Sequence, residues 1–579
     1  MNRQRVTITL IFSILCIFIL ANGGLAQKEV TPERQGEDPA GATQSPDAGP
    51  TILISLNASG QQTNGESVRP ATDGTSRIIT FQSDASNLVS DDTNGVSDIF
   101  TKNTENGNVR RVSLASGGTQ GNAASQSPDI SSDGQWVAFH SWAFNLVSGD
   151  TNNVADVFLH DRNTRQTILV SRNNSGTIGN DVSYDPSVSS DGRFVAYWSY
   201  ASNLVGNDFN NRSDIFVFDR QTNQTQRVSV NNSGQEGNGD SKNPAISADG
   251  RFVVYESRAS NLVTGDSGLY TDIFLFDRNS GTTTRLSLRG NGAEGQGDSF
   301  EPDISSDGTK IVFTSLAANL IDGDTNGYPD IFYFDRSSGL MYRVSISSSG
   351  GQGNEWSEQP VVSDNGQYIA FRSRANNLVP NDTNNIGDVF VRNFPAGTTT
   401  RVSVSSTGGQ GNDASNDPGI TADGRYVVFA SRASNLVSND NNGLRDIFRK
   451  DQQDSPPPPP PTLTSNQTYG APGSYFTITG SNYPANQNAV VFANYVFISS
   501  GIAIPTGPDG NFQFLIRTDG ILEGQYIIAV GVPGVTLPVV LTISWQGPTW
   551  PKLADGPEVF IPPSVAPLNR YRYSPILRK

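Results

Sequence analysis

A length of 579 residues, with 35% hydrophobic and 17% charged residues, excludes both a single ordinary domain and a disordered chain. The formal net charge of −16 argues against nucleic acid or an anionic membrane as a partner, and favours solubility and attraction of cations. The 58 glycines and 33 prolines indicate a turn-rich β protein.

The first 26 residues have the order of a secretory signal peptide. Arg3 and Arg5 precede an apolar run over residues 6–20, and small residues end the segment. The run is short for a membrane span, so we expect cleavage rather than stable membrane insertion; a retained N-terminal anchor is the alternative. Cleavage removes two arginines and Cys16, the only cysteine, which takes the net charge to −18 and leaves no disulfide. We expect a bacterial protein that is secreted, periplasmic or on the cell surface, with residues 27–50 as a disordered leader.

An internal repeat dominates the next 400 residues or so. The stretch "NLVSDDTNGVSDIF" begins at Asn87 and returns in related form every 58 residues. The later copies begin at Asn145, Asn203, Asn261, Asn319, Asn377 and Asn435. A repeat of this length is typical of solenoids and propellers, in which each copy is one supersecondary unit.

Each repeat contains four strand-like segments separated by turn residues. In the second full copy they cover residues 127–131, 135–141, 156–161 and 166–171. The second segment, as in "RFVAY", is almost continuously apolar, which is typical of a strand covered on both faces. Four-stranded sheets stacked face to face around an axis provide that environment, so the repeat predicts a β-propeller.

The strand count predicts seven blades and indicates which segment completes the last blade and closes the ring. The second and third segments each occur seven times, and so does the serine after the fourth: Ser55, Ser113, Ser171, Ser229, Ser287, Ser345 and Ser403. An eighth serine would fall at position 461, which is proline. We therefore expect residues 51–56 to supply the outer strand of the last blade, which leaves no open sheet edge.

The line "SPDISSDG" followed by "WVAF" and a later "DVFLHDR" resembles the TolB-like and WD-repeat-like propellers of exported bacterial proteins. The resemblance covers residues 51–452 and implies the propeller fold, but no single function, because propellers bind, scaffold and catalyse. Seven repeats rather than six, and long inserts, depart from the TolB pattern. A role in the Tol envelope system is therefore not expected.

The long loops between the strands predict which end of the propeller binds a ligand. Long loops connect the second strand to the third and the fourth strand to the next repeat, so both sets are expected at one end of the sheets. Seven aromatic residues on these loops break the repeat symmetry: Trp142, Tyr184, Tyr200, Tyr270, Phe300, Tyr328 and Trp356. Five of them are candidate ligand-binding residues: Trp142, Tyr184, Tyr270, Tyr328 and Trp356.

The same loops carry the order D-x-N-G-x-x-D, whose oxygen atoms are plausible calcium ligands. The candidate ligands are Asp92, Asn94, Asp98, Asp150, Asn152, Asp156, Asp208, Asn210, Asp214, Asp324, Asn326, Asp330, Asp382, Asn384, Asp388, Asp440, Asn442 and Asp446. The acid at position 12 of a standard calcium loop is missing. Asx-turns that fix the start of the third strand are therefore the alternative explanation.

Signals for catalysis are poor. The two histidines, His140 and His160, lie on predicted strands, and the chain has no G-x-S-x-G motif. A two-carboxylate polysaccharide hydrolase or lyase is an alternative, and a pure scaffold is a third. The sequence favours a protein that binds an extracellular glycan or protein partner, with no certain cofactor and with its oligomeric state left open.

The C-terminal region differs from the repeats. Six consecutive prolines make residues 453–461 a stiff linker. Short β segments over residues 462–544, beginning with "GAPGSYFTITGSNY", predict a small β-sandwich that resembles bacterial immunoglobulin-like modules. Residues 545–579 are a predicted tail.

Overall fold

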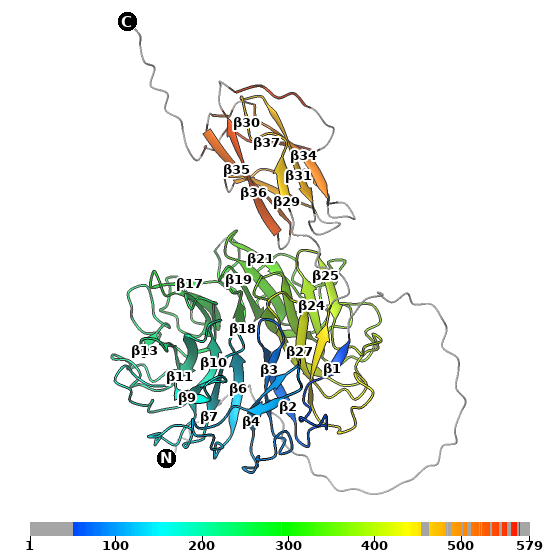
Figure 1. Ribbon diagram of the computed structural model, residues 1–579. Coiled ribbons are helices and arrows are strands. Elements are labelled where there is room, and N and C mark those ends of the chain that lie inside the picture. The colour runs from blue at the N-terminus through cyan, green and yellow to red at the C-terminus, as the bar shows by residue number, and fades with distance from the viewer. Residues whose placement is uncertain are drawn as a thin grey trace, which may run out of the picture. The chain divides into compact units, whose positions relative to one another are not determined.

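The computed structural model describes residues 50–290, 292–452 and, with gaps, 462–567 (Figure 1). The predicted signal peptide, nearly all of the leader, the proline linker and the end of the tail lie outside the described residues. The described residues contain strands and turns and no helix. Within this part, nothing helical is therefore long and apolar enough to cross a membrane.

Residues 51–451 form four-stranded antiparallel sheets, seven of them among the described residues. Their first strands are β2 (Ser67–Thr72), β6 (Ser125–Ile130), β10 (Ser183–Val188), β14 (Ser241–Ile246), β18 (Ser299–Ile304), β22 (Ser357–Val362) and β26 (Ser415–Ile420). The second strands are β3 (Ile78–Ser83), β7 (Trp136–Ser141), β11 (Phe194–Ser199), β15 (Phe252–Ser257), β19 (Lys310–Ser315), β23 (Tyr368–Ser373) and β27 (Tyr426–Ser431). The third strands are β4 (Asp98–Asn103), β8 (Asp156–Asp161), β12 (Asp214–Asp219), β16 (Asp272–Asp277), β20 (Asp330–Asp335), β24 (Asp388–Asn393) and β28 (Asp446–Asp451). The fourth strands are β5 (Val109–Arg111), β9 (Gln166–Leu169), β13 (Gln224–Arg227), β17 (Thr282–Arg285), β21 (Leu340–Arg343), β25 (Thr398–Arg401) and β1 (Thr51–Leu53).

The first strands form a closed circle. Each contacts the first strand of the next sheet, and β26 contacts β2, so the last sheet lies against the first. The second, third and fourth strands of each sheet follow outward in that order. This arrangement is a β-propeller, and Figure 1 shows its sheets following one another from blue to yellow.

The seventh sheet is completed from the N-terminal end of the described chain. Strand β1 pairs antiparallel with β28, with Thr51 opposite Lys450 and Leu53 opposite Phe448. This is the pairing that the serine count predicted. Regular pairing ends at Leu53, three residues before the predicted end of the strand.

The core lies between neighbouring sheets because the second and third strands are apolar on both faces. One phenylalanine or tyrosine of the second strand stacks on a phenylalanine of the third, with ring centroids 5.8–6.1 Å apart. Hydrophobic clusters join each sheet to the next, as Ile215 and Tyr255 do between the third and fourth sheets. Packing of this kind holds the repeats together without a disulfide.

The C-terminal unit consists of two sheets that share one hydrophobic cluster. One sheet contains β29 (Thr462–Ser465), β31 (Tyr475–Ser481), β34 (Phe512–Arg517) and β37 (Glu558–Phe560). The other contains β30 (Tyr469–Gly470), β36 (Val535–Ile543), β35 (Gly524–Val532), β32 (Val490–Ala493) and β33 (Val496–Phe497). Strand β37 pairs with β34, and Val559 lies in the cluster. The unit therefore extends beyond residue 544, the boundary predicted from the sequence.

Candidate functional site

The two sets of long loops lie against each other in every sheet. In the first repeat, Asn87 Nδ2 donates to the Gln62 carbonyl at 2.9 Å, and the Asn64 amide donates to Asn87 Oδ1 at 3.1 Å. The same pair of bonds is made by Asn145, Asn203, Asn261, Asn319, Asn377 and Asn435. The long loops therefore share one end of the propeller, as predicted.

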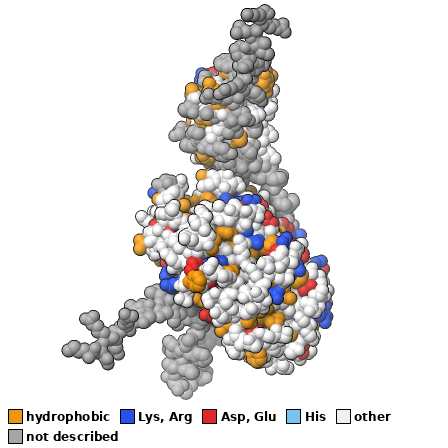
Figure 2. Space-filling view, turned by 90° about the vertical axis from the view of Figure 1, so that its left-hand side faces the viewer, with side chains coloured by type: hydrophobic (Ala, Val, Ile, Leu, Met, Phe, Trp, Pro, Cys, Tyr) orange, Lys and Arg blue, Asp and Glu red, His pale blue; other side chains and the backbone are white. Residues whose placement is uncertain are grey.

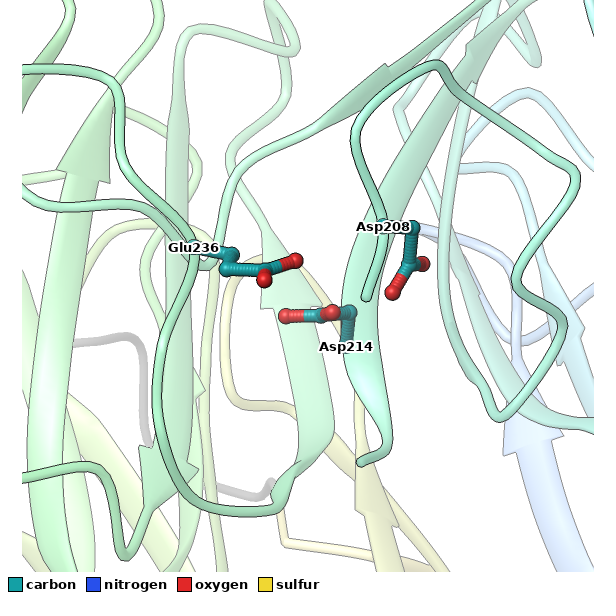
Figure 3. Close-up of side chains that lie close together, drawn as sticks. All are labelled: Asp208, Asp214 and Glu236. Carbon is teal, nitrogen blue, oxygen red and sulfur yellow. The ribbon is translucent and has the colours of Figure 1, made fainter. Parts of the chain in front are cut away.

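In five sheets an arginine lies between the two aspartates of the loop that precedes the third strand. Four of these aspartate pairs are predicted calcium ligands, and the fifth is Asp266 and Asp272 of the fourth sheet. In the third sheet, Arg227 Nη1 is 3.5 Å from Asp208 Oδ1, 3.3 Å from Asp214 Oδ2 and 3.0 Å from Glu236 Oε2. Figure 3 shows these three carboxylates pointing toward one another. The equivalent arginines, Arg111, Arg285, Arg343 and Arg401, lie 3.2–3.8 Å from their aspartates. A guanidinium thus occupies the position between the carboxylates of Asp92/Asp98, Asp208/Asp214, Asp266/Asp272, Asp324/Asp330 and Asp382/Asp388.

In six of the seven loops an asparagine holds the loop backbone through side-chain hydrogen bonds; the fourth loop has Gly268 at this position. Asn210 Nδ2 donates to Asp214 Oδ2 at 3.0 Å and to the Gly237 carbonyl at 2.9 Å, while its Oδ1 accepts the Arg212 amide. The bond to the aspartate recurs at Asn94, Asn152, Asn326 and Asn442, and Asn384 makes the bond to the carbonyl. These contacts are the Asx-turn geometry that was the alternative to metal binding.

The third residue of every first strand has a left-handed backbone. These residues are Arg69, Ser127, Asp185, Asn243, Glu301, Gln359 and Asp417, with φ between 44° and 55°. Strand pairing shifts register at this position in all seven sheets, which marks a β-bulge. Such a conformation costs a non-glycine residue on the order of 1–3 kcal/mol and often occurs at functional sites. We call these seven residues the axial ring.

Side chains of the axial ring bond to one another across sheets. Arg69 Nη1 donates to Ser127 Oγ in the next sheet and lies 3.5 Å from Asp185 Oδ1, two sheets away. On the other side, Gln359 Nε2 donates to Asp417 Oδ1 at 3.0 Å, and the Asp417 amide donates to Gln359 Oε1 at 3.1 Å. The ring therefore gathers different polar groups from every sheet into one place.

Four aromatic side chains adjoin one side of the axial ring, and we call them the aromatic wall: Trp142, Tyr184, Trp198 and Tyr200. The Tyr184 ring lies 5.8 Å from Trp142 and 4.9 Å from Trp198, and Tyr200 meets Trp198 edge-on at 5.9 Å. Lys242 Nζ lies 5.2 Å from the centre of the Trp198 ring. Trp142 is 36% exposed and the other three rings are half-buried. The wall thus offers accessible aromatic surface beside a cation.

Asp185 joins the wall to the axial ring. Trp198 Nε1 donates to Asp185 Oδ2 at 3.0 Å. Behind it, burial lowers the pKa of His140, which favours the neutral ring, and its Nδ1 can then accept a hydrogen bond from the Asp185 backbone amide at 3.4 Å. His140 also packs edge-on against Tyr184 at 4.9 Å. Its role is to support the wall.

Two carboxyl groups with raised pKa values, Glu301 and Asp303, lie on the first strand of the fifth sheet. The Glu301 amide donates to Glu256 Oε2 at 3.0 Å, and Glu301 Oε2 accepts the Gln359 amide at 2.9 Å. Burial raises the pKa of Glu301 and that of Asp303 to about 7. A substantial fraction of both groups is therefore protonated at neutral pH.

This protonation predicts a pH dependence of stability. A folded-state pKa above the unfolded value means that the folded state holds the extra proton, so the free energy of unfolding should fall as pH rises from about 4 to about 7. Glu301→Gln removes one such group and should reduce this fall by about 1–3 kcal/mol. Denaturation at pH 5 and pH 8 measures it, with Glu105→Gln at an exposed turn as the control. An unchanged fall in Glu301→Gln contradicts the assignment.

The structure separates the predicted ligand-binding aromatics. Trp142 and Tyr184 lie together in the wall, whereas Tyr270, Tyr328 and Trp356 have no ring contact with it among the described residues. The sequence analysis did not include Trp198 among the candidate ligand-binding residues, and it interpreted His140 as a structural residue of a strand. The sequence does contain a signal: the positions of Tyr184 and Trp198 carry a different residue in each of the seven repeats, while the serines that flank them do not change.

No protein-family model and no curated protein matches the chain. Among solved structures, TolB from Acinetobacter baumannii is 16% identical, with a TM-score of 0.31 over 51% of this chain and 59% of that one. An oligogalacturonate lyase in complex with manganese is 12% identical, with a TM-score of 0.43 over 70% and 98%. The Dos1 propeller is 10% identical, with a TM-score of 0.37 over 70% and 96%. These similarities are too distant to transfer an activity, and the fold rests on the sheets described above.

Proposed function

We propose that this chain is a secreted, periplasmic or cell-surface bacterial protein whose seven-bladed β-propeller binds a glycan at the aromatic wall and axial ring without turning it over. The observation that carries the proposal is the aromatic wall beside Asp185 and Lys242. Apolar surface with a few convergent polar groups is the usual composition of a ligand site. A sugar presents an apolar ring face to aromatic side chains and hydroxyls to charged ones.

The strain of the axial ring supports a site at this position. Seven left-handed residues in one circle cost stability, and their side chains differ from sheet to sheet. The surface in Figure 2 carries charged side chains of both signs, interspersed over the described residues on that face. In this proposal, recognition rests on local contacts at the wall. In this proposal the proline linker is a spacer between the propeller and an immunoglobulin-like β-sandwich.

A glycan array with the mature chain tests the proposal. We expect binding to a defined set of polysaccharides that Trp142→Ala weakens about tenfold or more, because truncating a central aromatic contact typically costs over 1 kcal/mol. Trp356→Ala is the matched control, since Trp356 is 43% exposed but lies apart from the wall, and we expect less than a twofold change. Equal effects of the two variants, or binding to protein ligands alone, contradict the proposal.

One observation favours an enzyme as the second candidate. Glu301 combines a pKa of about 7 with a neighbouring carboxylate, Glu256, as a general acid requires. A polysaccharide hydrolase or lyase would release reducing ends or unsaturated sugars, and Glu301→Gln would abolish the release. We expect no such products from the glycans that bind.

A further inference from the structure

The fourth strands place one residue at the same register position in all seven sheets. It lies opposite the phenylalanine of the third strand, as Arg227 lies opposite Phe216. In five sheets this residue is the arginine that lies between the two aspartates. In the second sheet it is Leu169, and in the seventh it is Leu53. The second and seventh sheets therefore lack the arginine that lies between the two aspartates in the other five sheets.

Both sheets nevertheless keep the aspartates. Asp156 and Asp446 are fully buried, and Asp150 and Asp440 are 8% and 5% exposed. Within residues 50–290 and 292–452, the structure gives Asp150 Oδ1 and Asp440 Oδ2 no hydrogen-bond partner. Ion pairs at these aspartate positions in the described chain are confined to the five sheets with arginine. Two acidic pairs are thus buried without a neutralising side chain, which is unfavourable unless a cation binds or a carboxyl group takes up a proton.

A second difference leaves the same oxygen atoms free. In the first sheet, Gln120 Nε2 donates to Asp92 Oδ1 at 2.9 Å and to Asp98 Oδ2 at 3.1 Å. The second sheet has Ile178 at this position, so Asp150 lacks this donor as well as the arginine. In the seventh sheet, Gln62 Nε2 donates to Asp440 Oδ1 at 3.1 Å, and Asp440 Oδ2 is left without a hydrogen-bond donor among the described residues.

Burial of the paired acids has an electrostatic consequence. Two carboxylates that are buried beside each other have lost their hydration and repel each other. An ion with two positive charges between each pair would remove this penalty.

We propose that calcium binds between Asp150 and Asp156 in the second sheet and between Asp440 and Asp446 in the seventh, at the position that a guanidinium occupies in the other five. Carboxylate oxygens are the ligands that a hard divalent cation prefers. Water completes the coordination shell, because each site supplies few protein ligands, and a dissociation constant near that of extracellular calcium modules follows, about 10⁻⁴–10⁻³ M. The proposal does not depend on glycan binding.

Counting bound calcium on the mature full chain tests it. After treatment with chelator, the chain is dialysed against calcium in physiological salt, and bound metal is measured by atomic absorption. We expect Asp150→Asn to reduce the count by about one ion per chain and Asp150→Asn/Asp440→Asn to reduce it by about two. A count that is unchanged in the folded double variant overturns the proposal.

The repeat supplies a sharper pair of variants. Leu53→Arg/Leu169→Arg introduces the arginine found in the other sheets, so it should also lower the count by about two, while its melting temperature in chelator stays equal or rises. Arg343→Leu makes the reverse change in the fifth sheet and should add about one ion. Circular dichroism confirms folding in each case. A folded arginine double variant that still binds as much calcium as the natural chain overturns the proposal.

Discussion

Replacing Arg227 with methionine should lower the free energy of unfolding by about 3–5 kcal/mol. Methionine keeps most of the side-chain length but leaves the carboxylates of Asp208, Asp214 and Glu236 close together without a cation. Two of these acids are almost fully buried, so water cannot replace the lost guanidinium. Removing one partner of a buried ionic cluster leaves an uncompensated charge, and this lowers stability far more than replacing the whole cluster with apolar side chains would.

Denaturant unfolding at pH 8 measures this effect, with Arg193→Met as the matched control. Arg193 also pairs with an aspartate, Asp219, at 2.8 Å, but its side chain is 34% exposed, so we expect a much smaller loss of stability than in Arg227→Met. The loss in Arg227→Met should shrink at pH 5. Burial already raises the pKa of Asp208 to about 6, and protonation then relieves the repulsion in the folded state. If Arg227→Met and Arg193→Met lower the free energy of unfolding equally, removing the cation from the buried cluster costs no more than removing an exposed arginine.

Deleting residues 50–56 should abolish cooperative folding of the propeller. Strand β1 covers the outer edge of β28, Ile54 is buried in the cluster that joins the seventh and first sheets, and Ser55 Oγ donates to Asp446. Burial of Ile52, Leu53 and Ile54 contributes about 4–6 kcal/mol, which is comparable to the total stability of many domains. The deletion also leaves an unpaired edge, so aggregation is expected.

Thermal unfolding and gel filtration of the deleted chain check this expectation. A peptide with residues 50–57 added in trans should pair with the open edge of β28 and restore part of the stability, as added strands do in β-augmentation. A peptide of the same composition in scrambled order is the control. If the deletion lowers the melting temperature by only a degree or two, ring closure by β1 does not hold the propeller together.

Local sequence determined the second and third strands well, and the first strands less so. Residues 156–161 were predicted as a strand and form β8 with the same bounds. The first strand of that repeat was predicted to begin at Ser127, but β6 begins at Ser125 and contains a bulge at Ser127. Serine is a common turn residue, so the sequence alone does not indicate a strand at Ser127. In the structure Ser127 has a positive φ and is kept in the sheet by the closed circle of first strands.

The candidate sites show a similar division. The Asp/Asn spacing was interpreted as a calcium loop because that motif is local, whereas Arg227 follows Asp214 by 13 residues and reaches it through strand register. Comparing repeats at that position separates the five arginines from Leu53 and Leu169. Trp198 was missed because it lies in an apolar strand, and its position in the aromatic wall depends on the bulge that brings Tyr184 beside it.

Fluorine NMR of the chain labelled with 5-fluorotryptophan tests glycan binding at the aromatic wall most directly. The chain contains six tryptophans, and single substitutions assign their signals. On titration with a glycan that binds, we expect the signals of Trp142 and Trp198 to shift and those of Trp136, Trp356 and Trp550 to stay in place. Binding that shifts Trp356 or Trp550, and leaves Trp142 and Trp198 unchanged, would contradict the placement of the site.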